Sequence, residues 1–332
     1  MSTTNIVITV DTEEEGLWTG MYRRYNNTVK NIEFLPKLQL LFYRYGVTPT
    51  YLIDYPVATN PLAIEILKDI LLQQKCEIGA HLHPWCNPPF EGDVLWERFN
   101  TYLNQELQEK KLRTLIEVIQ ENFGIKPLSY RGGCWQISEV TLIVLERLGF
   151  LVDTSVVPLW KWDKNTIISY SNAPRYPYFP SRTDICQPGE STVLEVPVTV
   201  TFNKVVPRFL ELLIIRTPRI FHLMGILQKF GLKRIWLRPG TLTLEEMKSV
   251  ADCVIQNNGP ILNITFHSSE IMPGASPYNE TEKDVENFLN RLDMFLEYSI
   301  GKMGCKNTTL IDYRKSFHTY QFKRFFMKKD DD

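Results

Sequence analysis

Glu77-Ile-Gly-Ala-His81-Leu-His83-Pro-Trp85 is a short apolar segment that ends in two of the five histidines of this 332-residue chain. Such a run, bounded by polar residues, indicates a buried strand over 77–81. Because side chains alternate between the faces of an extended backbone, His81 and His83 point the same way, as two imidazoles that share a metal ion must. Taken alone, the pair is as typical of a structural pair or a solvated loop as of a metal site.

Strand and helix patterns alternate along most of the chain on both sides of this segment. Apolar and β-branched runs predict strands at 6–10, 48–54, 77–81, 127–131, 152–155, 194–200, 234–237 and 261–266. Amphipathic patterns predict helices at 34–45, 61–74, 98–122, 138–148, 206–230, 244–257 and 280–302. Strands separated by helices of this length pair in parallel through right-handed crossovers. We therefore expect an α/β fold, an incomplete or distorted (β/α) barrel of about seven parallel strands.

The domain organisation predicted from the sequence is simple. Residues 1–320 are expected to form one barrel domain with a helical insertion near 203–233, followed by a charged C-terminal tail over 321–332. The insertion is apolar, but charged residues and Pro218 interrupt it, which disfavours a membrane-spanning helix. Its lysines and arginines leave peripheral contact with a membrane surface as an alternative.

Composition narrows the class of protein. With 44% hydrophobic and 23% charged residues, the chain is typical of a soluble globular protein. Its formal net charge of −1 gives no overall electrostatic sign of nucleic-acid binding. The six cysteines stand singly, without a C-x-x-C pair, and the first residues lack the features of a signal peptide. We expect a cytoplasmic location.

A cluster of carboxylates follows the first predicted strand. The sequence Val10-Asp11-Thr-Glu13-Glu-Glu-Gly lies where α/β barrels assemble their active sites, at the carboxyl ends of strands. Asp11 and Glu13 can face the same cavity, although an acidic run by itself is more often a solvated loop. Together with His81 and His83, the cluster supplies the carboxylate of a catalytic divalent-metal site with an open position for water, and zinc is the first expectation.

Further predicted strand ends carry polar and aromatic side chains. The sequence Ser-Tyr-Arg131-Gly-Gly-Cys-Trp135 puts a cation and an aromatic ring after one strand, and Trp160 follows another. The last long strand ends at His267, which Ser-Ser-Glu270 follows. Tryptophans in such places belong to the core or stack on a sugar ring.

Taken in order, the acid at the first strand end and the stretches EIGAHLHPW, YRGGCW and TFHSSE resemble the successive motifs of the polysaccharide deacetylase family, carbohydrate esterase family four. The resemblance spans about residues 5–270 and is greatest to a divergent branch with VDTE and GAHLHPW motifs. It implies an incomplete barrel in which one acid is the base and an arginine orients it. A second acid and two histidines bind the metal, and a late histidine is the general acid.

Carried over by motif, the resemblance implies that Asp11 is the base, Arg131 its orienting residue and His267 the general acid. The remaining assignments are metal binding by Glu13, His81 and His83, and substrate contact by Trp85, Trp135, Trp160 and Glu270.

Two positions depart from the family's usual pattern. Thr12 stands where a second acid usually follows the first, so Glu13 becomes the candidate metal carboxylate. Trp85 stands where the second histidine usually lies, so His83 has to take its place.

The function implied by the resemblance is a metal-dependent hydrolase that removes acetyl groups from an N- or O-acetylated sugar or polysaccharide. Two alternatives stay open, because a fold does not fix its chemistry. One is hydrolysis of a non-sugar C–N amide bond. The other is a metal-free, non-catalytic barrel that binds glycans.

Overall fold

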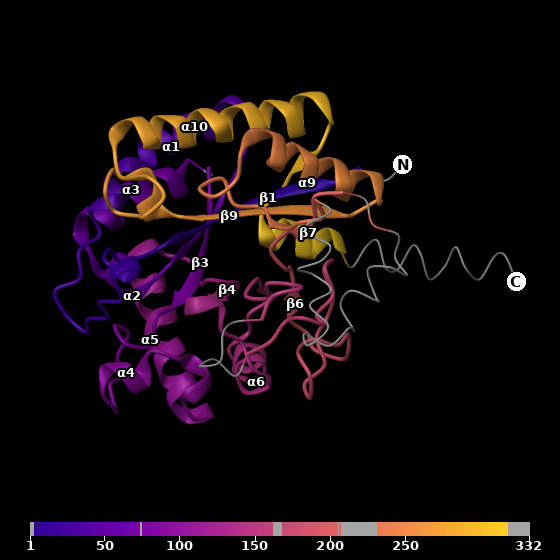
Figure 1. Ribbon diagram of the computed structural model, residues 1–332. Helices are drawn as coiled ribbons and strands as arrows, with labels where there is room; N and C mark the ends of the chain where they lie inside the picture. Colours follow the sequence, from indigo (N-terminus) through magenta and orange to yellow (C-terminus); the bar gives the residue numbers. More distant parts are fainter. Residues whose placement is uncertain (1–2, 74, 162–167, 205, 207–230, 318–332) are drawn as a thin grey trace, which may run out of the picture.

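A computed structural model describes residues 3–73, 75–161, 168–204, 206 and 231–317 (Figure 1). The main sheet consists of β1 (Asn5–Thr12), β2 (Thr50–Ile53), β3 (Glu77–Leu82), β4 (Ser129–Gly132), β5 (Val152–Asp153), β6 (Leu194–Glu195), β9 (Ile261–His267) and β10 (Lys306–Asn307). The helices are α1 (Leu35–Arg44), α2 (Tyr55–Thr59), α3 (Pro61–Leu72), α4 (Val94–Glu97), α5 (Gln105–Phe123), α6 (Glu139–Leu148), α9 (Leu244–Gln256) and α10 (Glu282–Leu296). The predicted insertion near 203–233 and the tail over 321–332 fall largely outside these described residues.

The sheet is parallel and curls toward a barrel without closing. Within the described chain, seven strands follow one another in the order β9-β1-β2-β3-β4-β5-β6, and each neighbouring pair is parallel. The short β10 adds to the start of β1, where Asn5 pairs with Lys306. The predicted α/β fold, an incomplete barrel of about seven parallel strands, is therefore confirmed.

The opening lies between β6 and β9, where two loop segments bridge the gap. The amide of Thr199 donates to the carbonyl of Asn263 on β9 at 3.2 Å, and the amide of Leu237 donates to the carbonyl of Thr199 at 2.9 Å. Two predicted strands change here. The run expected over 194–200 stops after Glu195, because Pro197 has no amide hydrogen to continue a ladder. The strand expected over 234–237 forms β8 (Arg234–Trp236), which pairs antiparallel with β7 (Val200–Phe202).

The alternation of side chains along β1 divides the molecule into two environments. Ile6, Ile8 and Val10 point outward into the main apolar cluster beneath the helices. The intervening residues point into the barrel, where Val7 packs with Leu310 of the helix over 310–317. Burying Ile6 and Ile8 stabilises the fold by about 2 kcal/mol each.

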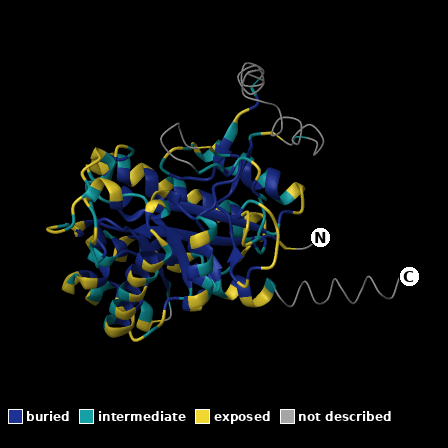
Figure 2. Cartoon of the chain, turned by 90° about the horizontal axis from the view of Figure 1, so that it is seen from below, coloured by how far each residue is buried: buried dark blue, intermediate teal, exposed yellow. Residues whose placement is uncertain are grey.

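The strands form the buried centre of the molecule, and the helices cover them (Figure 2). In Figure 1, α1, α9 and α10 lie together on one side of the β1–β9 pair. No helix in the described part of the chain is both long and apolar enough to cross a membrane.

Candidate metal centre and active site

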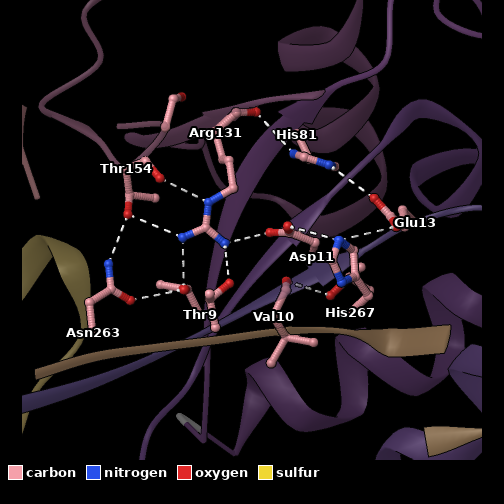
Figure 3. Close-up of polar contacts among 12 residues, drawn as sticks. Thr9, Val10, Asp11, Glu13, His81, Arg131, Thr154, Asn263 and His267 are labelled. Carbon is pink, nitrogen blue, oxygen red and sulfur yellow. Dashed lines mark hydrogen bonds and ion pairs between the residues drawn. The ribbon is translucent and has the colours of Figure 1, made fainter. Parts of the chain in front are cut away.

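The interior of the barrel becomes polar toward the carboxyl ends of its strands. Beyond Val7, the next inward residues on β1 are Thr9 and then Asp11, and both contact the buried guanidinium of Arg131 on β4 (Figure 3). Nη1 of Arg131 lies 2.5 Å from Oδ1 of Asp11, and Nη2 donates to Oγ1 of Thr9 at 2.8 Å. Nε donates to the carbonyl of Thr154 at 2.9 Å. The Arg131 guanidinium is thus held by acceptors around its edge, and it in turn holds the Asp11 carboxylate.

Glu13, His81 and His83 meet just above this layer. Nε2 of His81 lies 3.1 Å from Oε2 of Glu13, and Nε2 of His83 lies 3.3 Å from the same oxygen. All three side chains are buried, and their potential ligand atoms lie within 4.8 Å of one another. Nδ1 of His81 is 3.0 Å from the carbonyl oxygen of Arg131, which can only accept a hydrogen bond, so the proton belongs on Nδ1 and the lone pair on Nε2.

This donor set fits a divalent cation. Two imidazole nitrogens and one carboxylate are the ligands of catalytic zinc sites, which keep a further position for water. Burial alone would raise the pKa of the Glu13 carboxyl, but the charge of His267 and the short contacts with the rings of His81 and His83 outweigh it and hold that pKa well below its usual range. Glu13 is therefore ionised, as a metal ligand must be.

The other ring nitrogen of His83 faces a second carboxylate. Nδ1 of His83 lies 2.8 Å from Oε2 of Glu14, and the indole Nε1 of Trp85 donates to Oε1 of Glu14, also at 2.8 Å. Asp54, at the end of β2, accepts the backbone amide of Glu14 at 2.7 Å. The Trp85 ring stacks on His83 with a centroid distance of 4.2 Å.

His267 lies on the opposite side of the cavity at the end of β9. Its Nε2 is 3.6 Å from Oδ2 of Asp11 and 3.8 Å from Oε1 of Glu13, while its Nδ1 is 3.1 Å from Oε1 of Glu270. Burial lowers the pKa of His267, but the carboxylates of Glu13, Glu270 and Asp11 outweigh burial and raise it above its ordinary value. His267 can therefore carry a proton near neutral pH.

These groups surround a small cavity of about 140 Å³. Its lining residues are Asp11, Glu13, Leu17, Trp18, Tyr22, His81, His83, Trp85, Cys134, Trp135 and His267. Trp18 is fixed beside the site because its Nε1 donates to Oγ of Ser269 at 3.1 Å and its ring packs edge-to-face with that of His267 at a centroid distance of 4.9 Å. Gly133 is required at the rim, since a Cβ there would lie 2.5 Å from Cδ2 of His83.

The structure brings together six of the residues singled out from the sequence. Asp11, Glu13, His81, His83, Arg131 and His267 all face this one region. Trp135 also borders the cavity.

The other expected substrate contacts have different surroundings. Trp85 also borders the cavity, but it is fully buried and its ring stacks on His83. Trp160 lies away from the cavity lining, next to Trp236. Glu270 is buried beneath His267, where it also contacts Nη2 of Arg238 at 3.3 Å. These contacts favour support of the site by Trp85 and Glu270 over contact with a ligand.

Glu14, Asp54 and Arg238 were not singled out from the sequence. A signal existed for two of them, because Glu14 lies in the acidic run and Asp54 ends a predicted strand. Arg238 follows β8, whose antiparallel pairing the strand pattern does not reveal.

Neither a protein-family model nor a curated protein matches the sequence. The fold is nevertheless similar to solved structures. A "putative polysaccharide deacetylase" from Mycobacterium smegmatis gives a TM-score of 0.57 at 14% identity, covering 96% of this chain and 92% of that one. A "putative glycoside hydrolase/deacetylase" from Parabacteroides distasonis gives 0.58 at 11% identity, covering 92% of this chain and 69% of that one.

The same architecture also occurs in a 4-alpha-glucanotransferase from Thermococcus litoralis, with a TM-score of 0.53 at 10% identity. That match covers 94% of this chain and 40% of the other. At such identities the likeness shows a shared fold. Because the fold supports more than one chemistry, the function has to be argued from the site.

Proposed function

We propose that this chain is a metal-dependent hydrolase of the polysaccharide deacetylase kind, which removes acetyl groups from an N- or O-acetylated sugar or polysaccharide. The observation that carries the proposal is the meeting of a Glu13–His81–His83 donor set with the Arg131-bound Asp11 and with His267 around one cavity. The proposal extends to zinc as the metal and to a cytoplasmic location.

A divalent cation held by Glu13, His81 and His83 would polarise the acetyl carbonyl and make a bound water more acidic. Asp11 is suited to take the proton of the attacking water. Its Oδ1 is bound by Arg131, so Oδ2 is the oxygen that remains to accept a proton. The buried guanidinium of Arg131 keeps the Asp11 carboxylate in one orientation.

His267 is suited to return a proton to the departing amine or alcohol. Its Nδ1 faces the Glu270 carboxylate at 3.1 Å, which leaves Nε2 directed toward Asp11 and Glu13. A histidine with a raised pKa, placed opposite a carboxylate base, provides an acid and a base in the same cavity. The two proton-transfer groups therefore have separate supports, Arg131 for one and Glu270 for the other.

The size of the cavity agrees with a small acyl group as the reacting part of the substrate. A volume of about 140 Å³ is well below the several hundred Å³ of sites that enclose a whole ligand. The aromatic rings of Trp18 and Trp135 at the lining can pack against the apolar face of a sugar. The rest of the substrate would remain outside the cavity.

Metal removal and substrate choice test the proposal together. Protein stripped with a chelator and reloaded with zinc or cobalt should release acetate from N- or O-acetylated oligosaccharides, and the stripped protein should not. Linear and cyclic amides serve as competing substrates. If the metal-loaded protein hydrolyses only the amides, the substrate is a non-sugar amide and not an acetylated sugar. If the protein binds glycans tightly but shows neither hydrolysis nor bound metal, the result favours a non-catalytic barrel.

A further inference from the structure

His83 lies between the carboxylates of two consecutive residues. Its Nε2 is 3.3 Å from Oε2 of Glu13, and its Nδ1 is 2.8 Å from Oε2 of Glu14. A neutral imidazole has one N–H and one lone pair, so it can bind a cation through only one of these nitrogens. The partner that takes the N–H decides which nitrogen remains as a ligand.

Glu14 is held rigidly in the position that takes this N–H. Its second oxygen accepts the indole N–H of Trp85 at 2.8 Å, and its backbone amide donates to Asp54 at 2.7 Å. Both Glu14 and Trp85 are buried, so water does not compete for these hydrogen bonds. The Glu14 carboxylate therefore has a separate N–H donor for each of its oxygens.

The plane of the His83 ring is fixed as well. Trp85 stacks on the ring at a centroid distance of 4.2 Å and an interplanar angle of 24°. Gly133 leaves no room on its side, because even a Cβ there would come within 2.5 Å of Cδ2 of His83. A half-turn flip of the ring would put Cδ2 in the place of Nδ1 and so break the Glu14 contact.

We infer that Glu14 is the positioning residue of the metal centre: it binds Nδ1–H of His83, with Trp85 holding the carboxylate, and so directs Nε2 toward the cation. The inference rests on the metal centre of the proposed function. In this arrangement Trp85 holds Glu14 through its indole N–H and holds the His83 ring by stacking. A hydrogen bond that a ligating histidine donates to a carboxylate fixes the tautomer and the orientation of the ring, and its loss weakens metal binding about 10- to 100-fold.

A competing arrangement uses the same residues. Glu14, His83 and Cys86 also lie within 4.8 Å of one another, and Cys86 Sγ is 3.5 Å from Oε1 of Glu14. These atoms could form a second cation site on the Nδ1 side of His83. The two N–H donors that already occupy the Glu14 oxygens favour the positioning role, which predicts one ion per chain.

The test measures binding of zinc to the full chain by titration calorimetry and counts bound ions by elemental analysis. Glu14→Gln keeps the shape of the side chain but has one acceptor atom in place of two, so that its NH2 group faces one of the two N–H donors. It should weaken zinc binding about 10- to 100-fold without changing a stoichiometry of one. Trp85→Phe keeps a ring stacked on His83 and removes one N–H donor to Glu14, so it should weaken zinc binding less than Glu14→Gln does. Glu15→Gln, which alters the next carboxylate along the chain, should bind within about twofold of wild type, because Glu15 does not contact His83.

A second readout separates positioning from a general loss of structure. Long-range ¹H–¹⁵N NMR of the zinc-loaded wild type should show His83 with its proton on Nδ1, and Glu14→Gln should lose this single tautomer while its metal-free melting temperature stays within a few degrees.

Wild-type affinity in Glu14→Gln, two ions per chain, or a proton on Nε2 would each overturn the inference. One tightly bound ion in a protein without deacetylase activity would overturn the proposed function and leave the inference standing. A wild type that binds no ion would overturn both.

Discussion

Arg131 and Asp11 form a buried ion pair across the barrel, with Nη1 2.5 Å from Oδ1. The backbone carbonyl of the same arginine accepts a hydrogen bond from Nδ1 of His81 at 3.0 Å. One residue of β4 thus orients both the proposed base and a proposed metal ligand. The position of Asp11 relative to His81 therefore depends on this one residue of β4.

Arg131→Met should lower the free energy of unfolding by about 3–5 kcal/mol, because it leaves the Asp11 carboxylate buried without its cation. Deacetylation should fall by at least about tenfold in the protein that remains folded, because Asp11 loses its fixed orientation. Urea denaturation and acetate release measure the two effects. Arg113→Met is the control: this arginine pairs with Glu109 on the surface of α5, and its loss should cost less than about 1 kcal/mol. Equal losses in the two variants would contradict the prediction.

Asp11→Asn and Glu13→Gln should separate the base from the metal carboxylate. Of these two carboxylates, Glu13 is the one that contacts both histidine Nε2 atoms, so Glu13→Gln should lose bound metal, whereas Asp11→Asn should keep it and lose turnover. Elemental analysis and acetate release on the same preparations measure both properties. Metal loss in Asp11→Asn with retention in Glu13→Gln would exchange the two roles.

Lys111→Met should destabilise the loop that follows His83. The Lys111 ammonium on α5 donates to the carbonyls of Pro84, Asn87 and Pro89 at 2.9, 2.7 and 2.6 Å. Removing it leaves these acceptors without their donor, at a cost of about 3 kcal/mol. The adjacent Lys110→Met is a matched control, because Lys110 forms an exposed pair with Glu106 and its loss should cost less than about 1 kcal/mol. Chemical denaturation measures the free energy of unfolding of the two variants. Equal values for both would contradict the prediction.

Glu195→Gln should change how stability depends on pH. Burial and the neighbouring Asp153 raise the pKa of Glu195 well above its ordinary value of 4.5, and burial raises the pKa of Asp153 as well. The folded protein therefore holds a proton that the unfolded chain releases, so stability is lost as pH rises from about 4.5 toward the folded pKa.

Glutamine donates to Asp153 at every pH, so the variant should match wild type near pH 4 and become relatively more stable as pH rises. Urea denaturation over a pH series measures the difference between the two proteins. A wild-type curve parallel to that of the variant would show that the carboxyl pair does not share a proton.

The parts of the site that lie at strand ends could be predicted from the sequence. Asp11, His81, Arg131 and His267 each end a strand that its apolar pattern reveals, and parallel strands bring their carboxyl ends to one edge. The same pattern predicted the parallel barrel and most of its helices. Local periodicity was sufficient to place these residues at strand ends, whereas their roles were implied by the resemblance to the deacetylase motifs.

What could not be predicted depends on contacts between distant loops. From the sequence, Glu270 is expected to contact the substrate, and only the fold shows its carboxylate against Nδ1 of His267 and against Nη2 of the distant Arg238. Trp85 reads as a sugar platform until its indole N–H is seen to bind Glu14. The early end of the strand expected over 194–200 follows from Pro197, a signal that is present in the sequence.

The acidic run after β1 looks like a solvated, interchangeable sequence, yet each of its three carboxylates contacts a different set of atoms. Glu13 contacts the histidine Nε2 atoms, Glu14 contacts Nδ1 of His83, and Glu15 accepts from the amide of Asn31 and the hydroxyl of Thr28. Deleting or inserting one residue here would leave the segment acidic but would move each carboxylate away from the atoms that it contacts. Among homologues, we expect the number of residues between Asp11 and Glu14 to tolerate no insertion or deletion, whereas the identity of residue 15 should vary.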